Sequence, residues 1–303
     1  MCYDTVRFQV KRNNFPFGNT LEMKQFLSNR KKEKSQKKGY SHIHFRDTEY
    51  GANYFWEGHI GKIRVEIYAT FVSIIVSLPK FYHGNNFKPL TRETTKKAIL
   101  KLNSKLPFNI DLRREKVTVL HAGCVIRTDD PPTDYFDCLD KKPYFRREKK
   151  DDENTLYFKT EEQTNTFYDK KQEAADKGSV IPEEFEEGNY LRYESKFKKN
   201  PKKQLNTDVT EITGATLYNK KFYNAVVAQC YIEFKKIRKK QVKKGAPEAQ
   251  KIDEMYQELN EKIHNVLISE IGREVEIPCR KKRKPKRKVT IRKEGNRRIR
   301  VYT

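Results

Sequence analysis

The sequence predicts an α+β fold in which helices pack on a mainly antiparallel sheet, followed by a helical hairpin and a basic tail. Up to about Phe197, most segments have the alternation or the short apolar runs of β-strands. The helical segments among them do not follow strict strand–helix–strand order, which favours an antiparallel over a parallel sheet. Beyond Pro201, apolar residues recur at helical spacing instead.

The strands and helices that precede Pro201 can be predicted in order. TVRFQV alternates from residue 5 onward, and residues 58–78 have the pattern of a meander of two or three strands. Residues 91–106 have helical spacing, with a threonine cap at the start and Pro107 as a stop signal. Residues 117–126 (VTVLHAGCVI) are apolar on both faces, which predicts a central, covered strand.

The next segments continue the mixed pattern. Residues 155–171 resemble a β-hairpin, 170–178 (KKQEAADKG) a short helix that ends at Gly178, and 189–199 a further strand. Two apolar runs at helical spacing then flank KKGAP at 243–247. We therefore predict an αα-hairpin in this part of the chain.

Three regions follow from this pattern: a main domain at 1–203, a helical region at 204–275 and a flexible basic tail at 276–303. The tail has too few apolar residues to pack. Its cations, including Lys281 and Arg283, are expected to contact nucleic-acid phosphates without reading bases. A solvated charge run that contacts nothing is the alternative.

Composition also indicates the kind of partner. The chain of 303 residues has 65 Lys and Arg against 41 Asp and Glu, a formal net charge of +24, which favours a polyanionic partner. No membrane association is expected, because the longest apolar run, residues 69–78, is shorter than the roughly 20 residues of a membrane span. Five cysteines without CxxC pairing indicate reduced cytoplasmic thiols, not a zinc site or a disulfide framework.

Residues 191–198 (LRYESKFK) form a first candidate site. In a strand, Arg192, Glu194 and Lys196 lie on one face and the apolar residues on the other. One carboxylate among cations is typical of a plain charge ladder. It would also suit a metal ligand, Glu194, in a positively charged site that binds phosphate, and the residues alone leave both interpretations open.

Residues 164–173 (TNTFYDKKQE) contain a candidate nucleophile. If the strand continues to Lys170, then Tyr168 and Lys170 share a face. A phenol is a weak nucleophile, and a neighbouring ammonium or metal favours its phenolate. Since the chain contains 17 tyrosines, Tyr168 could equally be a packing aromatic.

Several short segments in a fixed order resemble one protein family. They are SLPKFYHGNN, VTVLHAG, TLYF, FYDKKQE and LRYE, between residues 77 and 194. Their order is similar to that of the gene II/X replication proteins, the rolling-circle initiators of filamentous phages and related plasmids. The resemblance implies a metal-dependent endonuclease that nicks and rejoins origin DNA. It would become linked through tyrosine to the 5′ phosphate and leave a 3′ hydroxyl for a polymerase.

The resemblance also implies roles for single residues. The family's Y-x-K-x-x-E pattern falls on Tyr168, Lys170 and Glu173. Tyr168 is then the nucleophile, and Lys170 stabilises charge on the phenolate or the scissile phosphate. The R-[FY]-E pattern is retained at residues 192–194.

The metal site implied by the resemblance departs from the family. The pattern R-[IL]-D reads Val119, Leu120, His121 here, so the arginine is lost and an imidazole replaces the carboxylate. We expect His121 and Glu194, with Glu173 as a further ligand, to hold Mg²⁺ or Mn²⁺. A core histidine is an equally good explanation of His121.

Two further segments carry weaker signals. His42 and His44 in SHIHF would share a strand face as a metal pair, although chance explains so short a string better. HGNN at 83–86 predicts a turn. Lys80, just before it, is a candidate phosphate contact, although an ordinary turn is the simpler interpretation.

These inferences together predict a rolling-circle DNA replication initiator in the cytoplasm of a bacterial host. It would bind origin DNA, duplex and single-stranded, through Lys80, Arg192, Lys196, Lys281 and Arg283. Since the chain contains no GxxxxGK[ST] phosphate loop, a host helicase would unwind the duplex for a host polymerase. A DNA-binding regulator that does not cut, favoured by the lost arginine, and a basic RNA-associated protein are the alternatives.

Overall fold

The computed structural model describes residues 2–11, 43–50, 53–68, 70–106, 109–149, 154–243, 245–268, 289–294 and 297–302, with the side chains of 2, 43–56 and 289–302 not described. Most strands belong to one large sheet. Their bounds are β1 (Cys2–Lys11), β2 (Ile43–Tyr50), β3 (Asn53–Ile60), β4 (Ile63–Ile67), β5 (Phe71–Ser77), β6 (Lys116–Thr128), β7 (Arg146–Lys149), β8 (Thr155–Lys159), β9 (Gln163–Asp169) and β10 (Asn189–Phe197).

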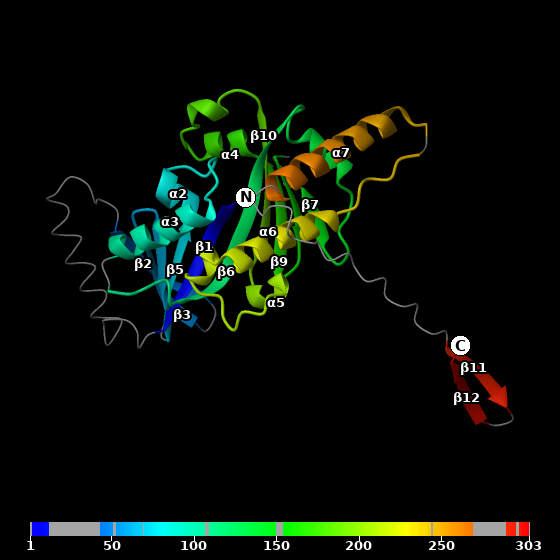
Figure 1. Ribbon diagram of the computed structural model, residues 1–303, viewed down its shortest axis with the longest axis horizontal. Helices are drawn as coiled ribbons and strands as arrows, with labels where there is room; N and C mark the ends of the chain where they lie inside the picture. Colours follow the sequence, from blue (N-terminus) through cyan, green and yellow to red (C-terminus); the bar gives the residue numbers. More distant parts are fainter. Residues whose placement is uncertain are drawn as a thin grey trace.

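The ten strands of this sheet lie in the order β2-β3-β4-β5-β1-β6-β10-β9-β8-β7 (Figure 1). All neighbouring strands are antiparallel. The predicted α+β class with a mainly antiparallel sheet is therefore confirmed. β6 is central as predicted, but it is covered on one face only, because Val119 and His121 on its other face remain partly exposed.

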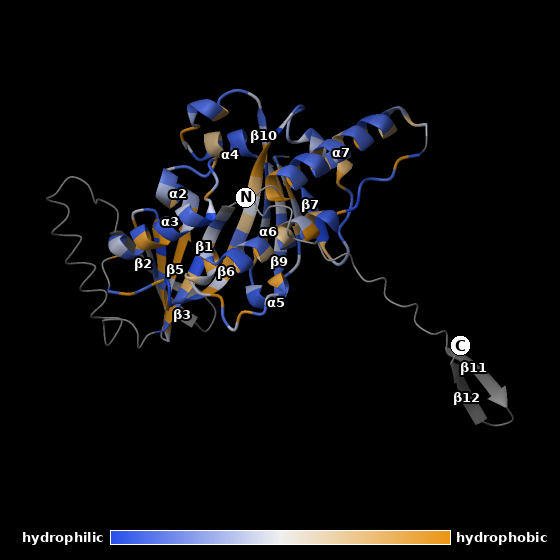
Figure 2. Cartoon of the chain, in the orientation of Figure 1, coloured by the Kyte–Doolittle hydropathy of each residue, from blue (hydrophilic) through white to orange (hydrophobic). Residues whose placement is uncertain are grey.

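Helices pack on one face of this sheet and at one of its ends. Their bounds are α2 (Leu78–His83), α3 (Arg92–Lys105), α4 (Lys170–Asp176), α5 (Pro201–Leu205), α6 (Lys220–Lys235) and α7 (Pro247–Ile268), with short 3₁₀ turns η2 (Asp134–Cys138), η3 (Glu183–Phe185) and η4 (Thr216–Tyr218). In Figure 1, α6 and α7 lie across the middle of the sheet, and both contact β6. Figure 2 shows the apolar residues concentrated along the central strands, while α4 and α7 are largely hydrophilic on the visible side.

The core lies between β10 and the two long helices. The Tyr193 ring stacks on Phe167 at 4.9 Å between centroids and meets Phe234 of α6 at 5.7 Å. Its hydroxyl donates to the Cys230 carbonyl at 2.9 Å. One continuous cluster of buried apolar residues runs from Tyr3 to Leu267. The predicted boundary near residue 203 is therefore not a boundary of the hydrophobic core.

The predicted helical hairpin and the predicted helix at 91–106 are both confirmed. α6 and α7 contact each other, and the last residue of the predicted KKGAP break, Pro247, begins α7. α3 begins after Thr91, whose side chain accepts a hydrogen bond from the Thr94 amide at 3.2 Å. Pro107, the predicted stop, lies outside the described residues.

The hairpin at 155–171 is confirmed as β8 and β9, but the strand ends one residue earlier than a shared Tyr168–Lys170 face requires. The Asp169 side chain accepts hydrogen bonds from the amides of Lys171 at 2.8 Å and Gln172 at 3.0 Å. This cap starts α4 at Lys170. The strand position predicted for Lys170 is wrong, whereas the short helix that ends before Gly178 is confirmed.

Part of residues 276–303, which were predicted to form a flexible basic tail, has regular structure. β11 (Val289–Glu294) and β12 (Arg297–Tyr302) pair with each other as an antiparallel hairpin. Lys281 and Arg283 lie outside the described residues. None of the helices that the structure describes is both long enough and apolar enough to cross a bilayer.

Gly123 gives a test of how closely β6 and β10 approach each other. A Cβ at this position would lie 2.0 Å from the Tyr193 carbonyl oxygen and 2.9 Å from Glu194 Cα, both backbone atoms. We expect Gly123→Ala to lower the free energy of unfolding by about 1–3 kcal/mol, the usual cost of overpacking. Urea unfolding would measure it. Val125→Ala, which only shortens a side chain of the same strand, is the control, and an unfolding free energy for Gly123→Ala equal to that of wild type would contradict the prediction.

Candidate active site

A cavity of about 400 Å³ opens on the sheet face opposite α6 and α7. Its walls come from β1, β5, β6, β8, β9 and β10, and from α2 and α4 at one end of the sheet. The polar side chains that line it include Asp4, Lys80, His121, Tyr157, Tyr168, Glu173, Glu194 and Lys196. The structure thus brings most of the predicted site residues to one place.

Strand register explains why these side chains meet. In β10, Tyr193 faces the helices, so Glu194 and Lys196 point to the other face. Lys196 pairs across the sheet with His121, and Glu194 pairs with Gly123, which has no side chain to fill the space. The predicted two-faced pattern of residues 191–198 is confirmed.

Glu194 is the centre of the site. It is 3% exposed, and its Oε1 accepts hydrogen bonds from the Tyr168 hydroxyl at 2.7 Å and from Arg192 Nε at 3.1 Å. Lys196 Nζ lies 3.5 Å from its Oε2. Burial alone would raise the pKa of this carboxyl, but Arg192 and Lys196 outweigh it and hold the pKa below its usual value. Glu194 is therefore an anion in a largely cationic surrounding.

Tyr168 is a neutral phenol in this arrangement. Burial, and then the adjacent Glu194 carboxylate, raise its pKa well above that of free tyrosine. Its hydroxyl therefore carries its proton at neutral pH and donates a hydrogen bond to Glu194. Any attack by this oxygen requires that Glu194 or a bound ligand accept the proton during the reaction.

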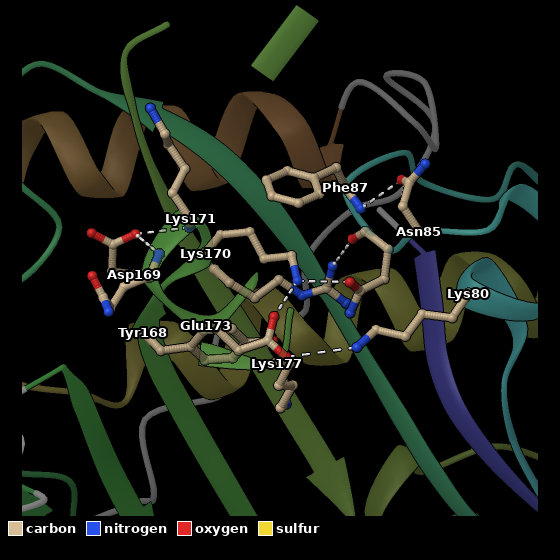
Figure 3. A network of polar contacts seen from close by, with 12 residues as sticks. Lys80, Asn85, Phe87, Tyr168, Asp169, Lys170, Lys171, Glu173 and Lys177 are labelled. Atoms are coloured by element: carbon tan, nitrogen blue, oxygen red, sulfur yellow. Dashed lines mark hydrogen bonds and ion pairs between the residues drawn. The ribbon is translucent and has the colours of Figure 1, made fainter. Parts of the chain in front are cut away.

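Lys170 does not bond to the Tyr168 hydroxyl. Its ammonium donates to Asn86 Oδ1 at 2.6 Å and to Glu173, and it lies 6.0 Å from the centroid of the Tyr168 ring. In Figure 3, Lys80 and Lys177 also converge on Glu173, Lys80 at 3.7 Å. Burial opposes ionisation of Glu173, but the bonds from Lys170 and Lys177 lower its pKa to about 2.

Arg192 was predicted to contact DNA, and this is wrong because the side chain is fully buried. Its Nη1 donates to the Asn86 carbonyl at 2.8 Å, and its Nη2 lies 3.6 Å from Asp4 Oδ2. Arg192 therefore positions Glu194 and balances its charge. Lys80 and Lys196 line the cavity with side chains 30% and 26% exposed, so both can reach a bound phosphate.

Asp4 is a site residue that the sequence prediction missed. Ser77 Oγ donates to its Oδ1 at 2.6 Å, and the carboxyl contacts Glu194. Burial, and then the nearby Glu194 carboxylate, raise its pKa. The available signal was an acidic residue inside the alternating strand pattern of β1.

Two carboxyls in contact are a partial metal site. Among the described residues, no three His, Cys, Asp or Glu side chains are grouped closely enough to enclose a metal. Glu173, a predicted ligand, is engaged by lysines instead. Mg²⁺ is commonly held by one or two carboxylates with the rest supplied by water and substrate phosphate, so Asp4 and Glu194 fit that ion.

His121, which was predicted to be either a metal ligand or a core histidine, lines the cavity from the open face of β6. Burial, and then Lys196, lower its pKa to about 4, so the imidazole is neutral at physiological pH. A neutral imidazole can accept a proton or bind a metal. Of the other predicted pair, His42 and the side chain of His44 lie outside what the structure describes.

The turn predicted at residues 83–86 is confirmed. Gly84 ends α2 with a φ of +85°, and Asn85 Oδ1 accepts a hydrogen bond from the Phe87 amide at 3.1 Å. This turn delivers Asn86 to Lys170 and Arg192 (Figure 3). Its role is thus to support the wall of the cavity.

Comparison with known proteins adds no relative. No protein-family model matches this chain, and no curated protein matches it significantly. The arguments on function below therefore rest on the residues of the site.

The lowered pKa of His121 predicts how the stability of the protein depends on pH. Its pKa is about 4 when folded against an ordinary 6.5, so between these values the unfolded chain binds a proton that the folded chain does not. Stability should therefore fall as pH drops from 6.5 to 4, and His121→Gln should flatten this decline. Urea titrations across that range would measure it, with the exposed His59→Gln as control. An unchanged pH profile in His121→Gln would exclude this explanation.

Proposed function

We propose that the chain nicks and rejoins origin DNA through Tyr168 and so initiates rolling-circle replication. One observation carries the proposal: the Tyr168 hydroxyl donates to Glu194 inside an open cavity whose other walls hold Lys80 and Lys196. A phenol beside a carboxylate in a cationic cavity suits attack on a phosphodiester, because the cations attract the phosphate and offset charge in the transition state. The formal net charge of +24 supports a nucleic-acid substrate.

The reaction is a transesterification and needs no outside reactant. The Tyr168 oxygen forms a bond to phosphorus while the bond from phosphorus to the 3′ oxygen breaks. The Tyr168 proton passes to Glu194, and one proton returns from there through solvent to the departing 3′ oxygen, which becomes a hydroxyl. The 5′ phosphate stays on Tyr168, so the bond energy is kept for rejoining.

A divalent cation, Mg²⁺ or Mn²⁺, completes the proposed site. Asp4 and Glu194 would hold it, with His121 as a neutral neighbour. When bound, the ion neutralises and orients the scissile phosphate. It would also stabilise the ionised form of Asp4, whose pKa is otherwise raised by burial and by Glu194.

The partners in this proposal are origin DNA, duplex and single-stranded, with a host helicase and polymerase. The sheet face that holds the cavity also carries Arg7 and Arg64, but both pair with acidic side chains, Arg7 with Glu66 and Arg64 with Glu57 and Glu66, so the proposed phosphate contacts are Lys80 and Lys196. The sequence contains no nucleotide-binding phosphate loop, so unwinding is assigned to the host.

A second candidate is a protein that binds origin DNA without cutting it. It is favoured by the raised pKa of Tyr168 and by Val119 in place of the family's arginine. The engagement of Glu173 by Lys170 and Lys177 also favours it, since no free carboxylate then remains there.

Tyr168→Phe separates the two candidates. It keeps the ring but removes the attacking oxygen, so stability should change by about 1 kcal/mol, the scale of one hydrogen bond. DNA binding should persist, while nicking of supercoiled origin DNA and the covalent protein–DNA adduct on denaturing gels should both disappear.

Tyr157→Phe is the matched control, because Tyr157 lines the same cavity from β8. It should form the adduct as wild type does. An adduct that survives in Tyr168→Phe and is lost in Tyr157→Phe would move the nucleophile to Tyr157. Absence of any adduct from wild type on origin DNA would favour the protein that does not cut.

Metal removal gives a further test. Chelation of divalent ions should abolish nicking and leave DNA binding in place, and Asp4→Asn should weaken Mn²⁺ binding by about tenfold, as expected when a metal loses one carboxylate. Electron paramagnetic resonance of free Mn²⁺ measures the binding without any reaction. Glu173→Gln, at the rim of the cavity, is the control, and nicking that continues under chelation would rule the metal out.

A further inference from the structure

Tyr144 lies at the tip of a tight turn and is fully exposed to solvent. Its side chain is 100% exposed, and its φ is +69°, in the left-handed region. The Phe145 amide donates to the Lys142 carbonyl at 3.1 Å, which closes a four-residue turn with Pro143 second and Tyr144 third. Glycine or asparagine normally occupies a third turn position of positive φ. Neither packing nor backbone preference therefore explains a tyrosine here.

Both flanks of the turn are fixed in the protein. Lys142 is 2% exposed and pairs with Glu233 of α6 at 2.5 Å. Its ammonium also lies 3.8 Å from the centroid of the Phe145 ring. Because these side chains are anchored, Tyr144 projects from a rigid base, and little conformational entropy is lost when a ligand stacks on it.

Exposed cations lie on the two segments that pair just before this turn. The turn is joined to the segment after α6, since the Arg238 amide donates to the Lys141 carbonyl at 2.8 Å and the Asp140 amide to the Arg238 carbonyl at 2.9 Å. Lys141, Arg146, Arg238 and Lys240 are all exposed. Lys141 and Arg146 have acidic neighbours, but Arg238 and Lys240 form no ion pair with the residues that the structure describes.

We propose that Tyr144 stacks on an unpaired base of single-stranded nucleic acid, with Arg238 and Lys240 on its phosphates. A rigid exposed ring on the same part of the surface as cations that form no ion pair is the combination that binds single strands without sequence preference. None of these residues lines the cavity of Tyr168, so this is a second contact on the same substrate. The inference rests on the proposed function only in taking DNA as the nucleic acid, and it does not require cutting.

The test is the binding of a labelled single-stranded oligonucleotide and of its duplex. Stacking on one aromatic is usually worth about 1–3 kcal/mol, so Tyr144→Ala should weaken single-strand binding by about fivefold or more. Duplex binding should change little, and Tyr144→Phe should bind the single strand as wild type does. Tyr144→Gly should lose as much single-strand affinity as Tyr144→Ala does. Its melting temperature should be equal to or higher than that of Tyr144→Ala, because glycine accepts the positive φ.

Tyr168→Phe, measured in parallel, distinguishes the two proposals, since it should lose the covalent adduct and keep single-strand binding. Single-strand binding that is unchanged in Tyr144→Ala would overturn the inference and leave the exposed ring to a protein partner. An equal loss for duplex and single strand would also overturn it.

Discussion

The buried ion pairs of Arg192 hold the candidate site together. An unpaired guanidinium in the sheet interior would cost several kcal/mol, so Arg192 requires acceptors around it. Glu194, Asp4 and the Asn86 carbonyl provide them, from β10, β1 and the turn after α2. One cation thus fixes three segments that are far apart in the chain. The position of Glu194 follows from this, and so does that of the Tyr168 hydroxyl.

Each face of β10 carries its own polar network. Towards the helices, Asn165 donates to the Tyr193 hydroxyl at 3.1 Å and to Ser195 Oγ at 2.7 Å, and it accepts from Lys142. Towards the cavity, Arg192 and Glu194 bond to each other. Since side chains alternate along a strand, a shift of one residue in register would exchange the two networks. The satisfied network under the helices therefore helps to set the register that builds the cavity.

Charge distribution gives the cavity its chemical character. Glu173 forms ion pairs with Lys80, Lys170 and Lys177, and Glu194 forms one with Lys196. Glu173 is ionised because of its lysines, and Glu194 because of Arg192 and then Lys196, while the acids in turn position these cations. In the proposed reaction, a phosphate that enters would meet cations already in place, which would lower the reorganisation needed for binding and for catalysis.

The sequence by itself determined the α+β class, the two-faced pattern of residues 191–198, the hairpin at 155–171 and the helix capped by Thr91. These features depend on local periodicity and capping, which neighbouring residues specify. It also indicated Tyr168 and Glu194 as members of one site, and their hydrogen bond is present.

Only the tertiary structure decided which charges meet. The cap at Asp169 places Lys170 in a helix, where it pairs with Glu173. Arg192, predicted as a surface contact to DNA, is buried and supports the site from inside. Asp4 joined the site because β1 and β6 are adjacent in the sheet, and β6 also pairs with β10. Pairing between strands distant in sequence, and the desolvation that follows it, are not encoded in local pattern. These long-range contacts therefore set the partners and the pKa of each group.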